Sequence, residues 1–124
     1  MSNRTPRIAI VDDDKAVCQA IQGFVRSLGY DAFTFASAED FLKSENIRGT
    51  SCLITDLQLP GLSGVDLQDR LIAAGYRIPT ILITGHPSNS ARARAMKAGA
   101  ICFLAKPFKH NDLLAGLETA LKAV

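Results

Sequence analysis

Five short apolar runs alternate with longer helical patterns along the chain, and this alternation is the strongest constraint on its fold. The runs are Ile8–Val11, Ala32–Phe35, Cys52–Thr55, Thr80–Ile83 and Ala100–Ala105. Short runs that are almost entirely apolar are typical of strands buried on both faces. Such strands form parallel sheets that are covered by helices on both sides, with right-handed crossovers. The alternation therefore predicts a doubly wound α/β domain.

Helix signals fill each gap between the runs. Helices are expected from about Lys15 to Gly29, from Ala38 to Ser44, from Ser63 to Gly75, from about Asn89 to Gly99, and from about Asn111 onward. Five strands separated in this way fit the flavodoxin-like strand order 2-1-3-4-5. A chain of 124 residues that is 48% hydrophobic can bury one core, so we expect residues 1–124 to form a single domain.

Polar side chains stand at the points where four of the runs end. They are the acidic triplet Asp12, Asp13 and Asp14, then Asp56, Thr84 and Lys106. In an open α/β sheet the carboxyl ends of the strands line one crevice. With the order 2-1-3-4-5, the chain reverses its direction of winding between the first and third strands. The acids that follow these two strands are therefore expected to meet.

The chemistry of such a crevice favours a divalent cation and a phosphoryl group. Clustered carboxylates repel one another, and a bound cation removes the conflict. Oxygen ligands without a nearby His or Cys select Mg²⁺, with Mn²⁺ as a substitute. Lys106 adds a positive charge and Thr84 a hydrogen-bond donor, so together they can hold a phosphoryl group while Asp56 attacks it. Asp14 is interpreted as a favourable charge at a helix start.

The other features of the composition indicate no further function. Cys18, Cys52 and Cys102 lack the spacing of metal ligands and are interpreted as core residues in a reducing compartment. A net charge of +2 is too small to indicate nucleic-acid binding. Neither a signal peptide nor a membrane-length apolar stretch is visible, so we expect a cytoplasmic protein without membrane contact.

From about Arg7 to Ala123, the chain resembles the receiver domains of response regulators in two-component signalling. The matching motifs are Val-Asp-Asp-Asp at 11–14, Thr-Asp at 55–56, Leu-Pro-Gly-Leu-Ser-Gly at 59–64, Ile-Thr-Gly-His at 83–86, Met-Lys-Ala-Gly-Ala at 96–100 and Lys-Pro-Phe at 106–108. Each motif alone is weak, but their order and spacing together are specific. The residues at 83–86 and 96–100, with Ser-Ala-Glu-Asp-Phe-Leu at 37–42, are most similar to the FixJ-like subgroup.

The resemblance implies a role for each residue of the crevice. Asp56 would be the phosphoacceptor, Asp13 a direct Mg²⁺ ligand, Asp12 a ligand acting mainly through water, Gln58 a ligand through its backbone carbonyl, Lys106 the phosphate-binding ammonium, Thr84 the switch hydroxyl and Phe103 the switch aromatic. Phe103 lacks the hydroxyl that a tyrosine would have at this position. Gln58 and His86 stand where family members tune dephosphorylation, which leaves the lifetime of the phosphoryl group open.

The resemblance also implies function and partners. Such a domain accepts a phosphoryl group from a sensor histidine kinase and catalyses only its own phosphorylation and dephosphorylation. Phosphorylation would favour a homodimer, and DNA would be bound only through an output domain that this chain lacks. We also expect Ile101, Leu104 and Leu113 to lie near Phe103 and transmit its movement. The alternative is a stand-alone phosphorelay receiver without a DNA-binding output.

Two other classes of protein fit the sequence less well. An aspartate-nucleophile phosphatase of the haloacid-dehalogenase kind requires a second aspartate two residues after the nucleophile, where Gln58 stands. A nucleotide-binding module would have a glycine-rich loop after the first strand. The acids at 12–14 occupy that place and would repel a nucleotide phosphate.

Overall fold

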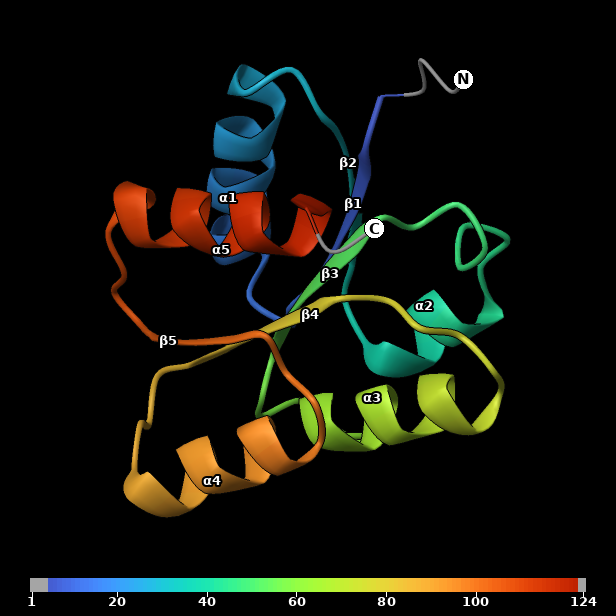
Figure 1. Cartoon of the computed structure of the whole chain (residues 1–124), viewed down its shortest axis with the longest axis vertical. Helices are drawn as coiled ribbons and strands as arrows, with labels where there is room; N and C mark the ends of the chain where they lie inside the picture. Colours follow the sequence, from blue (N-terminus) through green and yellow to red (C-terminus); the bar gives the residue numbers. More distant parts are fainter. Residues whose placement is uncertain (1–4, 123–124) are drawn as a thin grey trace.

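A five-stranded parallel sheet lies between two layers of helices (Figure 1). The computed structural model describes residues 5–122. The strands are β1 (Arg7–Val11), β2 (Asp31–Phe35), β3 (Cys52–Asp56), β4 (Thr80–Thr84) and β5 (Cys102–Ala105). The helices are α1 (Lys15–Ser27), α2 (Ala38–Lys43), α3 (Gly64–Ala73), α4 (Asn89–Lys97) and α5 (His110–Lys122). The predicted alternation is confirmed, with boundaries shifted by one or two residues.

The order of the strands in the sheet is β2-β1-β3-β4-β5, and every neighbouring pair is parallel. This is the flavodoxin-like order that the sequence predicted. From β1 the chain crosses to β2 on one side and then returns to β3 on the other side of β1. The carboxyl ends of β1 and β3 therefore flank the point where the winding reverses, which is where ligands bind in open α/β sheets.

Short polar side chains fix the starts of the helices. Asp14 caps α1, and its carboxylate accepts hydrogen bonds from the N–H groups of Ala16 and Val17. Ser63 caps α3 in a reciprocal arrangement with Asp66, in which each side chain accepts from the other residue's N–H. These bonds satisfy N–H groups that have no partner inside a helix. Asp14 thus does more than place a charge at the helix start.

Helices α1 and α5 cover one face of the sheet (Figure 1). The core on this face is one continuous cluster of large side chains, drawn from β1, β3 and β4 and from both helices. Its largest fully buried members are Ile8, Ile10, Ile54, Ile81, Ile83, Leu113 and Leu117. All three cysteines contact this cluster as free thiols, as expected for core residues.

Helices α2, α3 and α4 cover the other face, and the core there is divided. One cluster lies under α2 and α3 and includes Phe41, Leu53 and Leu67. A smaller cluster lies under α4, and Phe103 packs against it. Within residues 5–122, no helix is long and apolar enough to cross a membrane.

The expectation that Ile101, Leu104 and Leu113 pack beside Phe103 was wrong. Ile101, Leu104 and Leu113 belong to the core on the α1 and α5 face, whereas Phe103 packs on the α4 face. Successive residues of a strand point to opposite faces of the sheet, so Phe103 and Leu104 cannot share a layer. Phe103 therefore packs on the side of the sheet that α4 covers.

Candidate functional site

Four strand ends bring the predicted polar residues to one edge of the sheet. Asp12 and Asp13 follow β1 directly, and Asp56 and Thr84 are the last residues of β3 and β4. Lys106 follows β5 directly. Because all five strands are parallel, these ends lie at the same edge. The register confirms this, since Asp56 lies opposite Ile83, one residue before Thr84.

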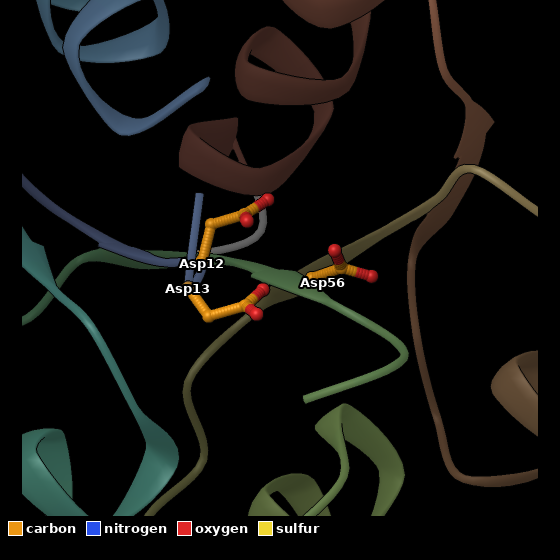
Figure 2. Close-up of side chains that lie close together, drawn as sticks. All are labelled: Asp12, Asp13 and Asp56. Carbon is orange, nitrogen blue, oxygen red and sulfur yellow. The ribbon is translucent and has the colours of Figure 1, made fainter. Parts of the chain in front are cut away.

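Three carboxylates gather at this edge, from the ends of β1 and β3 (Figure 2). One oxygen each of Asp12, Asp13 and Asp56 lies within 4.8 Å of the others. Asp12 is 1% exposed and Asp56 is 6% exposed, whereas Asp13 faces solvent. The cluster therefore combines two carboxylates held in the protein with one that is accessible from outside.

Lys106 joins two of these carboxylates. Its Nζ lies 2.7 Å from Asp56 Oδ2 and 2.9 Å from Asp12 Oδ2. Partial burial by itself lowers the pKa of the Lys106 ammonium, but hydrogen bonds and charge interactions with Asp56 and Asp12 outweigh it. The net result is a pKa raised above the usual 10.5. Lys106 thus carries a fixed positive charge at neutral pH.

Backbone N–H groups hold the remaining oxygens of the two buried carboxylates. Asp12 Oδ1 accepts from the N–H of Asp14 at 2.8 Å, and Asp56 Oδ1 accepts from the N–H of Gln58 at 3.0 Å. Both oxygens of Asp12 and both oxygens of Asp56 are therefore engaged within the protein. Asp13 is the carboxylate most open to a new ligand. Gln58 lies against Asp56 through its peptide group, and its side chain is exposed.

The balance of charge in the crevice suits a divalent cation. Three negative carboxylates face one ammonium, so two negative charges are left uncompensated by these residues. The donors are all oxygens, which favours a hard ion such as Mg²⁺ over zinc. The residues present therefore fit a magnesium ion, with Asp12, Asp13 and Asp56 as the carboxylates around it.

Thr84 and Phe103 lie on the same face of neighbouring strands. Phe103 is opposite Leu82, two residues before Thr84, and side chains repeat their direction every two residues. Thr84 is fully buried, and its Oγ1 accepts a hydrogen bond from the N–H of His86 at 3.0 Å. Phe103 is partly buried, and the guanidinium of Arg92 lies 5.9 Å from its ring centre. His86 itself is exposed.

Gly64 is a residue of the site that the sequence analysis did not assign. It is the first residue of α3, and a Cβ at this position would overlap the backbone carbonyl oxygen of Asp56. Its N–H donates to the carbonyl of Leu57 at 2.9 Å. Only glycine lets α3 approach β3 this closely. The sequence signal that could have identified Gly64 is its position directly after Ser63, the cap of α3.

Comparison with known families agrees with this fold. Residues 8–118 match the family described as the response regulator receiver domain. The chain belongs to this family. Receiver domains of response regulators are the partners of histidine kinases in two-component signalling, and this chain is such a domain.

Individual relatives support the same assignment. The chain is 43% identical over 122 residues to the response regulator protein TodT of Pseudomonas putida. It is 33% identical over 115 residues to the transcriptional regulatory protein FixJ of Bradyrhizobium diazoefficiens. These matches cover 98% and 93% of this chain, but only 54% and 56% of the two relatives. The chain thus spans about half the length of the curated relatives that it matches.

Solved structures give the same result. The crystal structure of FixJ-N matches with a TM-score of 0.88 and 34% identity, covering 98% of this chain and 97% of that one. The response regulator StyR matches with a TM-score of 0.89 and 39% identity, covering 97% of this chain and 61% of that one. The predicted similarity to the FixJ-like subgroup is therefore supported by both sequence and structure.

Proposed function

We propose that a sensor histidine kinase phosphorylates this chain on Asp56 in the presence of Mg²⁺, and that the phosphoryl group switches the surface around α4 and β5. The observation that carries the proposal is the arrangement of Asp56 between an ammonium and two further carboxylates. Lys106 contacts Asp56 at 2.7 Å, and an oxygen of Asp13 lies within 4.8 Å of one of its oxygens. A carboxylate in this setting can act as a nucleophile, because Lys106 and a cation held by the neighbouring carboxylates would stabilise the transferred phosphoryl group.

The chemical step requires Asp56 to exchange one of its present partners. Its Oδ1 is held by Gln58 and its Oδ2 by Lys106. An oxygen of Asp56 would attack phosphorus as the P–N bond of a phosphohistidine breaks, and the departing nitrogen would take a proton from solvent. Lys106 would then move its hydrogen bond from the carboxylate to a phosphoryl oxygen. A bound Mg²⁺ would supply further neutralisation of the phosphoryl charge.

The response would begin at Thr84. Its hydroxyl would turn toward a phosphoryl oxygen, and Phe103 on the neighbouring strand would move into the space released. A shift in population from 1:99 to 99:1 requires about 5.5 kcal/mol of differential stabilisation. A charge-assisted hydrogen bond from Thr84 and an ion pair with Lys106 would both contribute to this difference. Phe103 packs against α4, so α4 would be the first helix to repack.

The repacked face would favour a homodimer. The matches to relatives named as transcriptional regulators cover only 56% and 54% of those proteins. In a protein of that kind, DNA would be bound through the additional output domain. We further propose that the chain catalyses only its own phosphorylation and dephosphorylation. The alternative of a phosphatase acting on other substrates is disfavoured, because Gln58 stands where such an enzyme has its second aspartate.

The proposal predicts that Asp56 is the only phosphoacceptor and that modification needs a divalent cation. The protein would be incubated with acetyl phosphate, with Mg²⁺ or with an excess of chelator, and the modified residue mapped by mass spectrometry after reductive trapping. Wild type should be modified only with Mg²⁺, and Asp56→Asn not at all. Label that persists in Asp56→Asn, or in the presence of chelator, would exclude this function.

A second pair of variants separates the metal from the phosphoryl group. Asp13→Ala should weaken Mg²⁺ binding, because it removes a direct ligand and a negative charge. Lys106→Ala should leave Mg²⁺ binding unchanged or tighter, because a nearby positive charge is lost, yet it should slow phosphorylation. Isothermal titration with Mg²⁺ measures the first effect. Wild-type affinity in both variants would mean that the ion binds elsewhere.

A further inference from the structure

Glu39 links α2 to the loop between β3 and α3. It lies in the first turn of α2, and its Oε2 accepts a hydrogen bond from the N–H of Leu62 at 3.2 Å. The two residues are 23 positions apart. Among the described residues, only Asp56 and Glu39 make hydrogen bonds to the middle of this loop, residues 58–62. Asp56 lies at the start of the loop, so Glu39 is the partner that comes from another part of the chain.

Gly61 allows this contact to form. Its φ angle is +78°, in the left-handed region that favours glycine. A Cβ at this position would also overlap Oε2 of Glu39. The conformation of the loop thus favours glycine here, and glycine leaves space for the carboxylate of Glu39.

The Glu39 carboxylate is retained at an energetic cost. Its Oε1 is buried and has no hydrogen-bond partner among residues 5–122. A buried carboxylate oxygen without a partner is unfavourable. The dipole of α2 gives little reason to keep the charge, because this helix has only six residues and Asp40 already occupies the same turn. The cost points to a role for the contact with the loop.

The loop that Glu39 holds is the one that borders Asp56. Its ends are fixed by backbone bonds, from Leu57 to Ile83 at 2.7 Å and from Gly64 to Leu57 at 2.9 Å. Between them, the N–H of Gln58 holds Asp56 Oδ1. If the middle of the loop could move, the peptide of Gln58 would move with it. The Asp56 carboxylate would then lose the hydrogen bond that fixes its orientation.

We infer that Glu39 is a positioning residue for the phosphorylation site, which holds the β3–α3 loop so that Gln58 and Asp56 keep their arrangement for the metal ion. The inference rests on the proposed function of Asp56. Glu39 acts through the loop backbone and does not itself contact the phosphoryl group. Its effect is therefore expected first on Mg²⁺ affinity, and on the phosphorylation rate only when Mg²⁺ is limiting.

The test compares Glu39→Ala with Glu39→Gln by isothermal titration with Mg²⁺. The alanine variant should bind Mg²⁺ about tenfold more weakly, which is the usual size of an outer-shell effect on a metal site. The glutamine variant keeps an acceptor oxygen for Leu62, and its affinity should stay close to wild type. Phosphorylation of Glu39→Ala by acetyl phosphate should be slow at low Mg²⁺ and return to the wild-type rate at saturating Mg²⁺.

A matched control separates positioning from a general loss of stability. Val25→Ala removes buried methyl groups from α1 on the opposite face and should lower the melting temperature without changing Mg²⁺ affinity. If Glu39→Ala fails to fold, Gly61→Ala disturbs the same contact from the loop side and carries the same prediction. Wild-type affinity in the alanine variant, or equal weakening in alanine and glutamine variants, would overturn the inference.

The two proposals can fail separately. If wild-type Asp56 is not phosphorylated, the proposed function fails, whatever the Glu39 variants do. If Asp56 is phosphorylated with Mg²⁺ but Glu39→Ala behaves like wild type at limiting Mg²⁺, only the role of Glu39 is wrong.

Discussion

Helices α1 and α4 lie on opposite faces of the same sheet and are attached to it very differently. α1 buries Cys18, Ile21 and Val25 in the large continuous core. α4 buries only two residues, Ala91 and Ala95, in the smallest of the three clusters. Since the hydrophobic contribution is roughly 25 cal/mol per Å² of apolar surface buried, two alanines hold a helix much less firmly than these larger side chains.

This difference suits the two tasks of the proposed switch. The loop between β1 and α1 carries Asp12 and Asp13, which would have to keep a fixed geometry to bind a metal ion. α4 follows Thr84 in the chain and packs beside Phe103, where the proposed function would require movement. Segments that move are expected to be those of low local stability. The firmly packed side therefore holds the site, and the weakly packed side can respond to it.

The largest expected effect tests the difference in packing directly. Ile21→Ala in α1 should lower the free energy of unfolding by about 2–5 kcal/mol, because it leaves a cavity in the large core. Ala95→Gly in α4 should lower it by about 1 kcal/mol, mainly through helix propensity. Urea unfolding of both variants measures the two values. Equal losses would mean that α4 carries as much stability as α1.

A second effect concerns local opening. Ala91 in α4 and Cys18 in α1 are both 5% exposed, so a cysteine at position 91 can be compared with the native thiol in the same molecule. In Ala91→Cys, the new thiol should be labelled about tenfold faster than Cys18 at pH 8, since α4 opens at a lower free energy. Mass spectrometry of peptides gives each rate. Faster labelling of Cys18 would reverse the comparison.

Cys52, a native thiol buried within the large core, provides an internal reference for this experiment. Burial raises the pKa of the Cys52 thiol to about 12. A raised pKa makes the reactive thiolate rarer at any pH below it, so Cys52 should be almost unreactive at pH 8 until the protein unfolds. Rapid labelling of Cys52 in the native protein would show that the sheet itself opens.

The smallest effect concerns the switch. Addition of beryllofluoride with Mg²⁺, as a phosphoryl mimic, should change amide exchange in α4 and β5 severalfold and leave α1 unchanged. Thr84→Ala should remove this response, because the hydroxyl that senses the phosphoryl group is gone. Sedimentation of the same samples reports any homodimer. A change in α1 as large as that in α4 would contradict the division of tasks.

The sequence by itself determined the elements and where they end. The apolar runs became the five strands, and Ser63, at the predicted start of a helix, became its cap, because these signals act over a few residues. The position of polar residues after each run also predicted that Asp13, Asp56, Thr84 and Lys106 would share one edge. In a parallel sheet this follows from chain direction alone.

Only the tertiary structure decided which partners these residues choose. Lys106 bridges Asp12 and Asp56 across 94 and 50 positions of the chain, and Glu39 reaches Leu62 across 23. The tertiary structure also placed Phe103 against the α4 cluster and Leu104 against the core on the opposite face of the sheet. Such contacts depend on how layers pack and on distances of a few ångströms between distant segments. Local propensity carries no information on these distances, so the sequence indicated the gathering of the site but not its internal bonds.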